Sequence, residues 1–232
     1  MIIHLESVSS TMDAARSLIP QNPEDGSAVY ADYQEKGRGR IEGRRWEGLK
    51  GESLLVTFLF RTSSIAFPLS CFPLYAGYVV STSLCQLYGI KSQVKWPNDV
   101  LVDGDKISGI YCECIDNYIS CGIGINLLQK EFGESYRRRA CSVLSVSGKN
   151  ADRELLLKKM IENFKLNLNN SDWIKDFQSI LYKNNENITV LEGLADSGKK
   201  VSGLLCGIGS CGQLLIRMPD FSVQEIFTGE IQ

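Results

Sequence analysis

The segment from Lys95 to Gly109 carries the side chains best suited to act on a bound ligand. It opens with a cation, an aromatic ring, a proline, an amide and a carboxylate: Lys95, Trp96, Pro97, Asn98 and Asp99. Asp103 and Gly104 then predict a tight hairpin, because glycine takes a positive φ at no steric cost. The returning strand brings a second cation, Lys106, beside this cluster. Such convergence favours a site for an anionic, ring-bearing ligand. The alternative, a strand end with a proline turn and a buried Trp96, does not explain two cations and an acid together.

A second patch, rich in glycine and arginine, starts at Gln34 and extends to Trp46. Glycine lets the backbone approach a ligand closely, and guanidinium groups grip carboxylate or phosphate through paired hydrogen bonds. The indole of Trp46 offers a surface on which a nucleobase can stack. The residues concerned are Gly37, Arg38, Gly39, Arg40, Arg44 and Arg45. Taken alone, they fit a basic surface loop in contact with RNA equally well.

A third patch ends a strand with Gly122, Gly124 and Asn126. Strand positions without side chains allow a flat ligand to lie on the sheet. An asparagine there offers a donor and an acceptor together, the arrangement that pairs asparagine with adenine in DNA readout. An ordinary turn at the end of a strand is the alternative.

Other chemistries find little support. The segment Gly207–Gly212 has the spacing of a dinucleotide-binding loop, but a strand-like stretch follows it where that loop requires a helix, so it predicts a hairpin turn. His4 is the single histidine and there is no Cys-x-x-Cys pair, which argues against a zinc site and a nucleophile triad. No Walker lysine motif is present. The chemistry must therefore rest on positioning and charge.

Composition is that of an ordinary globular protein: 232 residues, 44% hydrophobic and 22% charged. The formal net charge of −2 argues against extensive coating of nucleic acid. The uncharged stretch Thr62–Ile90 is diluted by polar residues and prolines, so it predicts a buried core helix and not a membrane span. With no secretory signal visible, the eight cysteines are expected to be reduced and mostly buried, and the protein cytoplasmic.

The periodicity predicts helices and closely spaced strands, and the short connections demand antiparallel pairing. Four or five short strands with glycine turns follow Asn184–Asn187 and suit a small barrel. We therefore expect an α+β fold with two domains, residues 1–185 and 186–232. The predicted helices are Ser10–Ile19, the uncharged stretch up to Gly89, Arg153–Asn169 and Asp172–Tyr182. The predicted strands of the first domain are Ser27–Gln34, Ser53–Phe60, Ser92–Trp96, Val100–Val102, Lys106–Cys114 and Tyr118–Ile125.

Together the three patches, with Ser10 and Thr11 before them and Gly229-Glu230-Ile231 near the end, resemble the motif series of biotin protein ligases in order and approximate spacing. The resemblance covers nearly the whole chain. It implies a mainly antiparallel sheet flanked by helices, as in class II synthetase-like catalytic domains, and a small C-terminal SH3-like β-barrel. With no helix-turn-helix segment ahead of Ser10, it also implies a monofunctional form that lacks the DNA-binding domain of some relatives.

The activity implied by the resemblance has two steps. Biotin and ATP, with Mg²⁺, give biotinyl-AMP and pyrophosphate, and a lysine of the biotin carboxyl carrier protein then takes the biotinyl group. This agrees with a site built on placement and charge neutralisation. No DNA or membrane partner is expected, and a homodimer is possible.

The resemblance also implies roles for individual residues. Lys106, Arg38 and Arg40 are expected to be catalytic, and Asp99 to orient Mg²⁺. The residues implied in biotin binding are Ser10, Thr11, Gln34, Gly37, Arg38, Arg40, Lys106, Gly109 and Gly122. Those implied in binding ATP or the adenylate are Arg44, Trp46, Lys95, Asn98, Asp99, Gly124 and Asn126.

The chain departs from the family pattern in three places: an extra residue at Ile41–Glu42, Met12 where asparagine is common, and Ser53 where asparagine often follows the loop. Two alternatives stay open. One is a lipoate or octanoate ligase of the same superfamily, whose pocket takes a long chain. The other is a non-catalytic RNA-binding module that uses the glycine- and arginine-rich patch from Gln34 to Trp46, and its affinity for RNA would depend strongly on salt.

Overall fold

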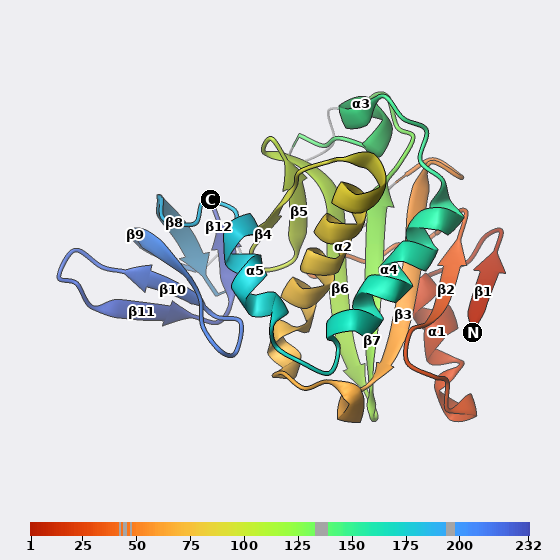
Figure 1. Cartoon of the computed structure of the whole chain (residues 1–232), viewed down its shortest axis with the longest axis horizontal. Helices are drawn as coiled ribbons and strands as arrows, with labels where there is room; N and C mark the ends of the chain where they lie inside the picture. Colours follow the sequence, from red (N-terminus) through yellow and green to blue (C-terminus); the bar gives the residue numbers. More distant parts are fainter. Residues whose placement is uncertain (42, 44–45, 47, 133–138, 194–197) are drawn as a thin grey trace.

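The structure is a computed structural model that describes residues 1–41, 43, 46, 48–132, 139–193 and 198–232. It has a large part of helices and strands and a smaller all-β part at the C-terminal end of the chain (Figure 1). The prediction of an α+β fold with a small β appendage is confirmed. The domain boundary near residue 185 stays a prediction.

A seven-stranded sheet forms the centre of the large part, in the order β1-β2-β3-β7-β6-β5-β4. Neighbouring strands pair antiparallel except β1 and β2, which are parallel. The strands are β1 (Ile2–Leu5), β2 (Ser27–Ala31), β3 (Ser53–Arg61), β4 (Gln93–Lys95), β5 (Asp99–Val102), β6 (Asp105–Ile115) and β7 (Tyr118–Asn126). The short edge strand β1 and its parallel pairing were not predicted, because four residues carry too little periodicity to stand out.

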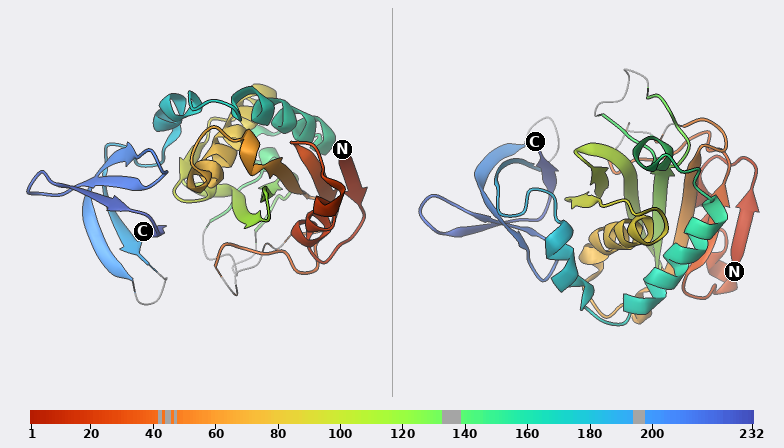
Figure 2. Two further views of the ribbon diagram at one scale, coloured as in Figure 1. Left: turned by 90° about the horizontal axis from the view of Figure 1, so that it is seen from below. Right: turned by 45° about the horizontal axis from the view of Figure 1, so that its top comes forward.

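The two faces of the sheet are covered differently (Figure 2). The helices α2 (Phe72–Tyr88) and α4 (Arg153–Asn167) pack on one face and bury the main hydrophobic core, which includes Phe58, Phe60 and Phe164. The short helix α1 (Thr11–Arg16) covers part of the other face, over Val29, Leu59 and Tyr118. The rest of that second face is left for the loop that follows Gln34.

The predicted helices are present, with shorter ends. The first stops at Arg16 and is followed by the 3-10 turns η1 (Ile19–Gln21), then η2 (Thr62–Ser64) and η3 (Leu69–Cys71) further along. The helices α3 (Val143–Ser147) and α5 (Trp173–Ile180) complete the set. The uncharged stretch is largely the buried helix α2, as predicted. Within the described ranges, no helix combines the length and the apolar character that a membrane crossing requires.

The C-terminal part is a five-stranded antiparallel sheet in the order β11-β10-β9-β8-β12. Its strands are β8 (Asn187–Glu192), β9 (Lys199–Ile208), β10 (Leu214–Arg217), β11 (Val223–Ile226) and β12 (Gly229–Ile231). The turn between β9 and β10 confirms that Gly207–Gly212 is a hairpin and not a dinucleotide loop. This turn contacts the large part, because the carbonyl of Gly212 accepts a hydrogen bond from Nε1 of Trp96 at 3.0 Å.

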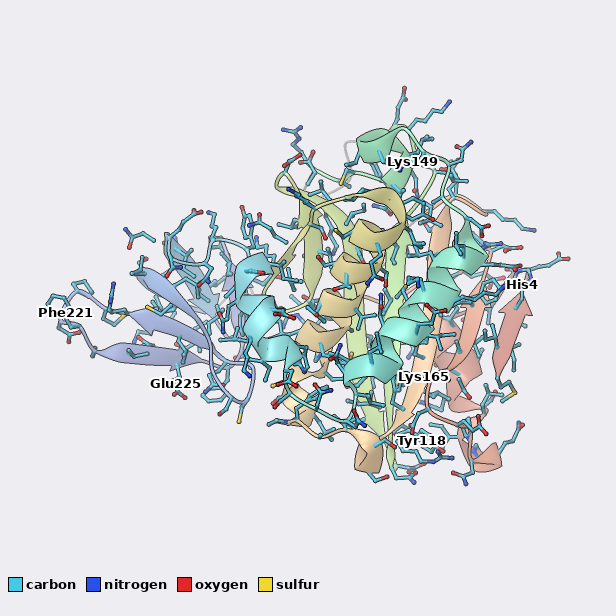
Figure 3. The ribbon with its side chains drawn as sticks, viewed as in Figure 1. His4, Tyr118, Lys149, Lys165, Phe221 and Glu225 are labelled. Carbon is cyan, nitrogen blue, oxygen red and sulfur yellow. The ribbon has the colours of Figure 1, made fainter. Side chains whose placement is uncertain are left out.

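His4 and Phe221 mark opposite ends of the molecule (Figure 3). His4 lies on the edge strand β1, where its ring stacks on Tyr30 and its Nε2 is 2.8 Å from Asp32 Oδ1. Phe221, on the hairpin between β10 and β11, is 83% exposed.

All eight cysteines lie in the described part of the chain, and none forms a disulfide. The expectation that most are buried is wrong for half of them, because their positions on strands, helix and turn face solvent. The exposed ones are Cys85, Cys114, Cys206 and Cys211.

Candidate active site

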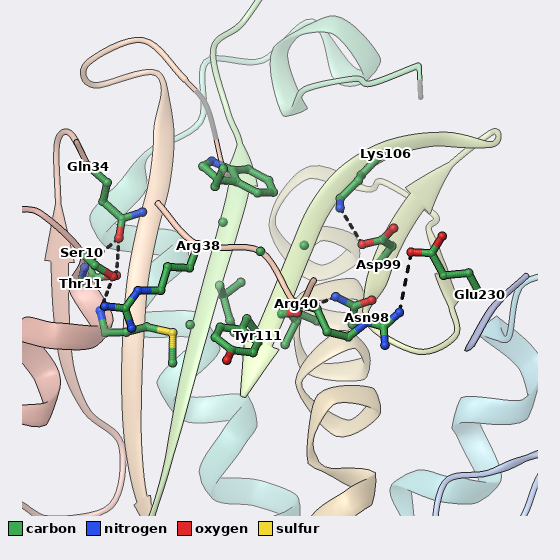
Figure 4. Close-up of a pocket in the computed structure, with 18 residues that line it drawn as sticks. Ser10, Thr11, Gln34, Arg38, Arg40, Asn98, Asp99, Lys106, Tyr111 and Glu230 are labelled. Carbon is green, nitrogen blue, oxygen red and sulfur yellow. Dashed lines mark hydrogen bonds and ion pairs between the residues drawn. The ribbon is translucent and has the colours of Figure 1, made fainter. Parts of the chain in front are cut away.

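A cavity of about 150 Å³ opens on the face of the sheet that carries α1 (Figure 4). Strands β6 and β7 form its floor, α1 and Gln34 close one end, and β5 with Glu230 of β12 closes the other. Most of the predicted site residues line it: Ser10, Thr11, Gln34, Arg38, Arg40, Trp46, Asn98, Asp99, Lys106, Gly109, Gly122 and Gly124. The three sequence patches therefore meet in one place.

The end of the cavity at α1 is a chain of hydrogen bonds between polar side chains. Oε1 of Gln34 accepts from the backbone N–H of Thr11 at 2.7 Å and from its hydroxyl at 2.9 Å. The hydroxyl of Thr57 on β3 donates to Oγ1 of Thr11 at 2.9 Å. Ser10 caps α1 by accepting from the N–H of Met12. Since these groups are fixed by one another, this end of the cavity presents donors and acceptors in set directions.

The floor is flat because glycines stand where side chains would otherwise project. A Cβ on Gly124 would lie 2.5 Å from Cε2 of Trp46, and a Cβ on Gly109 would lie 3.0 Å from the same ring. The indole of Trp46 therefore rests directly on β6 and β7. A Cβ on Gly122 would lie 3.0 Å from Sδ of Met12, so Met12 covers the floor nearer to α1. The glycines Gly122 and Gly124 were predicted to let a flat ligand lie on the sheet. In this structure the protein's own Trp46 indole lies over Gly124, and Met12 lies over Gly122.

Each of the three predicted catalytic cations has a carboxylate partner. Nζ of Lys106 lies 2.6 Å from Oδ1 of Asp99. One nitrogen of Arg38, Nη2, lies 2.6 Å from both carboxylate oxygens of Asp13. The third cation is Arg40. Its Nη2 lies 3.7 Å from Oε1 of Glu230 and donates to the carbonyl of Gly229 at 3.1 Å. The positive charge of the site is thus balanced within the chain, and an anionic ligand would meet cations held in place.

Asn98 joins strands β5 and β6 beside these charges. Its side-chain Nδ2 donates to the backbone carbonyl of Ile110 at 2.7 Å, and its backbone carbonyl accepts from the N–H of Ile110 at 2.9 Å. Asp99 follows directly and pairs across the strands with Gly109. This pair of hydrogen bonds joins β5 to β6 where Asp99 pairs with Gly109, within reach of the Lys106 side chain. The amide of Asn98 therefore has a structural partner as well as a place on the cavity wall.

Three of the predicted residues that the structure describes do not line the cavity. Asn126 is buried, and its Nδ2 donates to the carbonyls of Cys141 at 3.0 Å and Lys106 at 3.4 Å. Lys95 is also buried, with Nζ 5.8 Å from the centre of the Tyr182 ring. Gly37 supports the site through its backbone, because its carbonyl accepts from the N–H of Trp46. Arg44 lies outside the described residues.

Several residues at the site were not predicted. Glu230 lines the cavity although it lies nearly two hundred positions from Gln34 in sequence, and only its resemblance to a C-terminal motif singled out its segment. Tyr111 also lines the cavity, and burial together with a hydrogen bond to Glu113 raises its pKa. Thr57 and Asp13 do not line the cavity, but each contacts a predicted residue that does: Thr57 contacts Thr11, and Asp13 contacts Arg38. Their sequence contexts, a hydrophobic strand and a helix start, carry no signal for a ligand site.

The candidate site offers few ligands for a metal ion. Over the residues that the structure describes, no group of three or more His, Cys, Asp or Glu side chains is arranged to hold an ion. Asp99 lines the cavity, and Mg²⁺ with a nucleotide commonly uses one or two carboxylates plus substrate phosphates and water. Asp99 therefore fits a magnesium ion brought by a nucleotide better than a resident metal.

Comparison with known proteins identifies the family of the chain. Residues 4–127 match the model of the biotin/lipoate A/B protein ligase family. The bifunctional ligase/repressor BirA of Bacillus spizizenii is 31% identical over 170 residues, which cover 69% of this chain and 51% of that protein. The Escherichia coli protein of the same name is 29% identical and covers 89% of this chain and 66% of its own length. The chain thus spans about half the length of the first of these relatives.

Among solved structures, a biotin protein ligase from Aquifex aeolicus in complex with biotin and ATP superposes with a TM-score of 0.83 at 32% identity. The alignment covers 100% of this chain and 97% of that one. A Leishmania major biotin protein ligase with biotinyl-5-AMP shares the fold, with a TM-score of 0.71 at 23% identity. On the family match and these likenesses, the chain belongs to the biotin/lipoate A/B protein ligase family.

Proposed function

We propose that this protein is an ATP-dependent ligase that activates biotin as biotinyl-AMP and transfers the biotinyl group to a lysine of a carrier protein. In the first step a carboxylate oxygen of biotin attacks the α-phosphorus of ATP, and pyrophosphate leaves. In the second, the lysine amine attacks the acyl carbon, AMP leaves and an amide forms. Neither step needs a protein nucleophile.

One observation carries the proposal. A single cavity joins a hydrogen-bonding end, built on Thr11 and Gln34, to three cations about a flat glycine floor. The first end suits the ureido group of biotin, which offers both donors and an acceptor. The cations Arg38, Arg40 and Lys106 suit the carboxylate and the phosphate that must meet. A ligand spanning both ends would present its carboxylate where charge develops during adenylation.

The nucleotide would lie toward Asn98, Asp99 and Trp46. The indole of Trp46 provides an aromatic surface for the adenine, and Lys106 lies 5.9 Å from the centre of that ring. Mg²⁺, bound with the ATP phosphates, would neutralise their charge, and we assign its orientation to the carboxylate of Asp99. Gly37–Arg40 and Trp46 lie over the sheet, so we assign the loop Glu35–Gly51 the task of keeping water from the acyl-adenylate.

The acceptor is proposed by analogy with relatives. A Mycobacterium tuberculosis protein called biotin–[acetyl-CoA-carboxylase] ligase is 29% identical over 143 residues. A biotin carboxyl carrier protein is therefore the acceptor we assign. The family also includes lipoate ligases, whose substrate has the same carboxylate on a chain without a ureido group. The Thr11–Gln34 end favours biotin, since lipoate offers it no hydrogen-bonding partner.

The proposal is tested by biotin-dependent exchange of pyrophosphate into ATP with the purified full chain. We expect exchange with biotin, little with lipoate, and transfer of biotin to a carrier-protein lysine on addition of that protein. Exchange with lipoate but not biotin would assign the protein to the other branch of the family. No exchange with either, together with strongly salt-dependent RNA binding, would favour the RNA-binding alternative.

A further inference from the structure

The pair formed by Asp13 and Arg38 links the loop Glu35–Gly51 to helix α1 at the end of the cavity that α1 closes. We propose that Asp13 is a positioning residue that holds Arg38 over the site and slows the escape of the acyl-adenylate. The inference rests on the proposed function, because it assigns the loop a closed position while the intermediate is bound. Asp13 does not touch the ligand in this proposal and acts through Arg38.

Asp13 is a rigid anchor, because α1 is fixed on three sides. Ser10 caps the helix, and Met12 and Ala15 are buried against the sheet with 5% and 0% exposure. Thr11 is hydrogen-bonded to Gln34 just beneath. The carboxylate of Asp13 therefore projects from a helix whose position the core determines, while Arg38 belongs to a loop between strands. In such a pair, the helix determines where the guanidinium lies.

The contact leaves Arg38 able to serve a ligand at the same time. Both oxygens of Asp13 lie 2.6 Å from the same nitrogen, Nη2. A guanidinium carries five N–H donors in a planar fork, so Nε and Nη1 can still donate to a carboxylate or phosphate beneath. Arg38 lines the cavity, which places it within reach of such a ligand. Asp13 therefore acts together with an anionic ligand on Arg38 and need not be displaced by it.

A second arginine of the loop, Arg40, is held at the opposite end of the cavity. Arg40 contacts Gly229 and Glu230 of β12 in the C-terminal sheet. The short segment Arg38–Arg40 is thus attached to α1 at one end, through Asp13. At the other end it is attached to β12, where Figure 4 shows Arg40 paired with Glu230. Releasing the contact at α1 frees one end only, so the loop is expected to open more often and not to be lost.

The expected change in the rate of adenylate release follows from the solvent exposure of the Asp13–Arg38 pair. The side chains of Arg38 and Asp13 are 41% and 42% exposed. Ion pairs at such positions contribute little and are screened by salt, so loss of this one is expected to speed adenylate release about two- to fivefold at low salt. This modest, salt-sensitive change distinguishes a gating contact from one on which the fold depends.

The experiment measures release of preformed, radiolabelled biotinyl-AMP from the full chain after an excess of unlabelled compound is added. We compare the wild type with Asp13→Asn, Asp13→Glu, Arg38→Gln and the double variant Asp13→Asn/Arg38→Gln, at about 50 mM and about 500 mM KCl. Arg16→Gln is the matched control, because it removes another ion pair of the same helix, the one with Glu113, whose side chains are 52% and 21% exposed. Thermal melts of each variant report whether it is folded.

We expect faster release from Asp13→Asn, a smaller difference at high salt, partial recovery in Asp13→Glu and no change in Arg16→Gln. In the Arg38→Gln background, the Asp13 substitution should add nothing. Release from Asp13→Asn that is unchanged or slower than wild type would overturn the inference, and so would an equal acceleration in the Arg38→Gln background. If the wild type neither binds biotinyl-AMP nor exchanges pyrophosphate, the proposed function fails first and this inference falls with it. Normal exchange with normal release in Asp13→Asn removes this inference alone.

Discussion

Nζ of Lys106 lies 2.6 Å from Oδ1 of Asp99, on the strand next to its own. The two residues meet because β5 and β6 form a hairpin whose tight turn has positive φ at Asp103 and Gly104, 50° and 87°. A register shift between Val100 and Leu101 then sets Lys106 across from Leu101, while Asp99 pairs with Gly109. The ammonium group is thereby held over the floor of the cavity, beside the place assigned to the reacting carboxylate and phosphate.

Replacing Lys106 should remove adenylate formation. In Lys106→Ala, the charge that balances the developing phosphate is lost, and we expect biotin-dependent pyrophosphate exchange to fall by at least about 100-fold. We expect the same direction for Arg38→Ala. Lys175→Ala, at a lysine 85% exposed on α5, is the control and should retain full exchange. Near-normal pyrophosphate release from Lys106→Ala would remove it from the reaction.

A side chain at Gly124 should displace the indole from the floor. In Gly124→Ala, the added methyl would lie 2.5 Å from Cε2 of Trp46, which a well-packed ring cannot accept in place. We expect KM for ATP to rise about tenfold, as overpacking commonly costs 1–3 kcal/mol. The double variant Gly124→Ala/Trp46→Ala should be no worse than Trp46→Ala alone. A further loss in the double variant would mean that Gly124 contacts the ligand itself.

Thr57 is expected to affect biotin binding although it does not line the cavity. Its buried hydroxyl donates to Thr11, whose own hydroxyl donates to Gln34. Thr57→Val keeps the shape but removes this donor, at a cost of about 1 kcal/mol. KM for biotin should therefore rise about fivefold with kcat nearly unchanged, and Thr57→Ser should restore it. Thr62→Val, which removes an exposed hydroxyl, is the control and should leave both constants unaltered. A fall in kcat alone in Thr57→Val would contradict the role of Thr57 in biotin binding.

The cluster of Asp32, His4 and Arg153 should make stability depend on pH. Burial raises the pKa of Asp32, but the hydrogen bond from His4 and the charge of Arg153 more than offset it, so the pKa is lowered from 3.8. A lowered folded-state pKa stabilises the native protein above the unfolded value, and this contribution is lost as the pH falls through the folded value.

Asp32→Asn should therefore cost about 1–3 kcal/mol of unfolding free energy near neutral pH. The difference from wild type should shrink as the pH is lowered past 3.8. Urea titrations of both proteins at several pH values measure it. Asp172→Asn, at an exposed carboxylate on the surface, should show no such dependence. A difference that stays constant with pH would show that the charge of Asp32 is not what matters.

The sequence correctly predicted which residues lie together where they belong to one short segment. Lys106 and Asp99 lie on one hairpin, so local turn geometry brings them together whatever the rest of the fold does. Gly122 and Gly124 stand two residues apart on a strand and must face the same side. In these cases residue type and local periodicity were sufficient, because the contacts are made between near neighbours in the chain.

Asn126 shows where such reasoning is insufficient. Its place at a strand end beside glycines suggested contact with adenine, whereas its amide nitrogen donates to the carbonyls of Lys106 and Cys141. A role toward adenine remains a prediction for this residue. The difference arises because a buried amide must find partners, and the backbone supplies them at a position that only packing determines.

By itself, the sequence determined the kinds of chemistry present, the alternation of the strands and the family to which the motifs point. Tertiary structure alone decided that Asp13 meets Arg38, that Thr57 supports Thr11, and that Glu230 of the C-terminal sheet reaches the same cavity as Gln34. These contacts join segments that are far apart in the chain or carry no local signal. They depend on how helices and sheets pack, which periodicity within one segment does not encode.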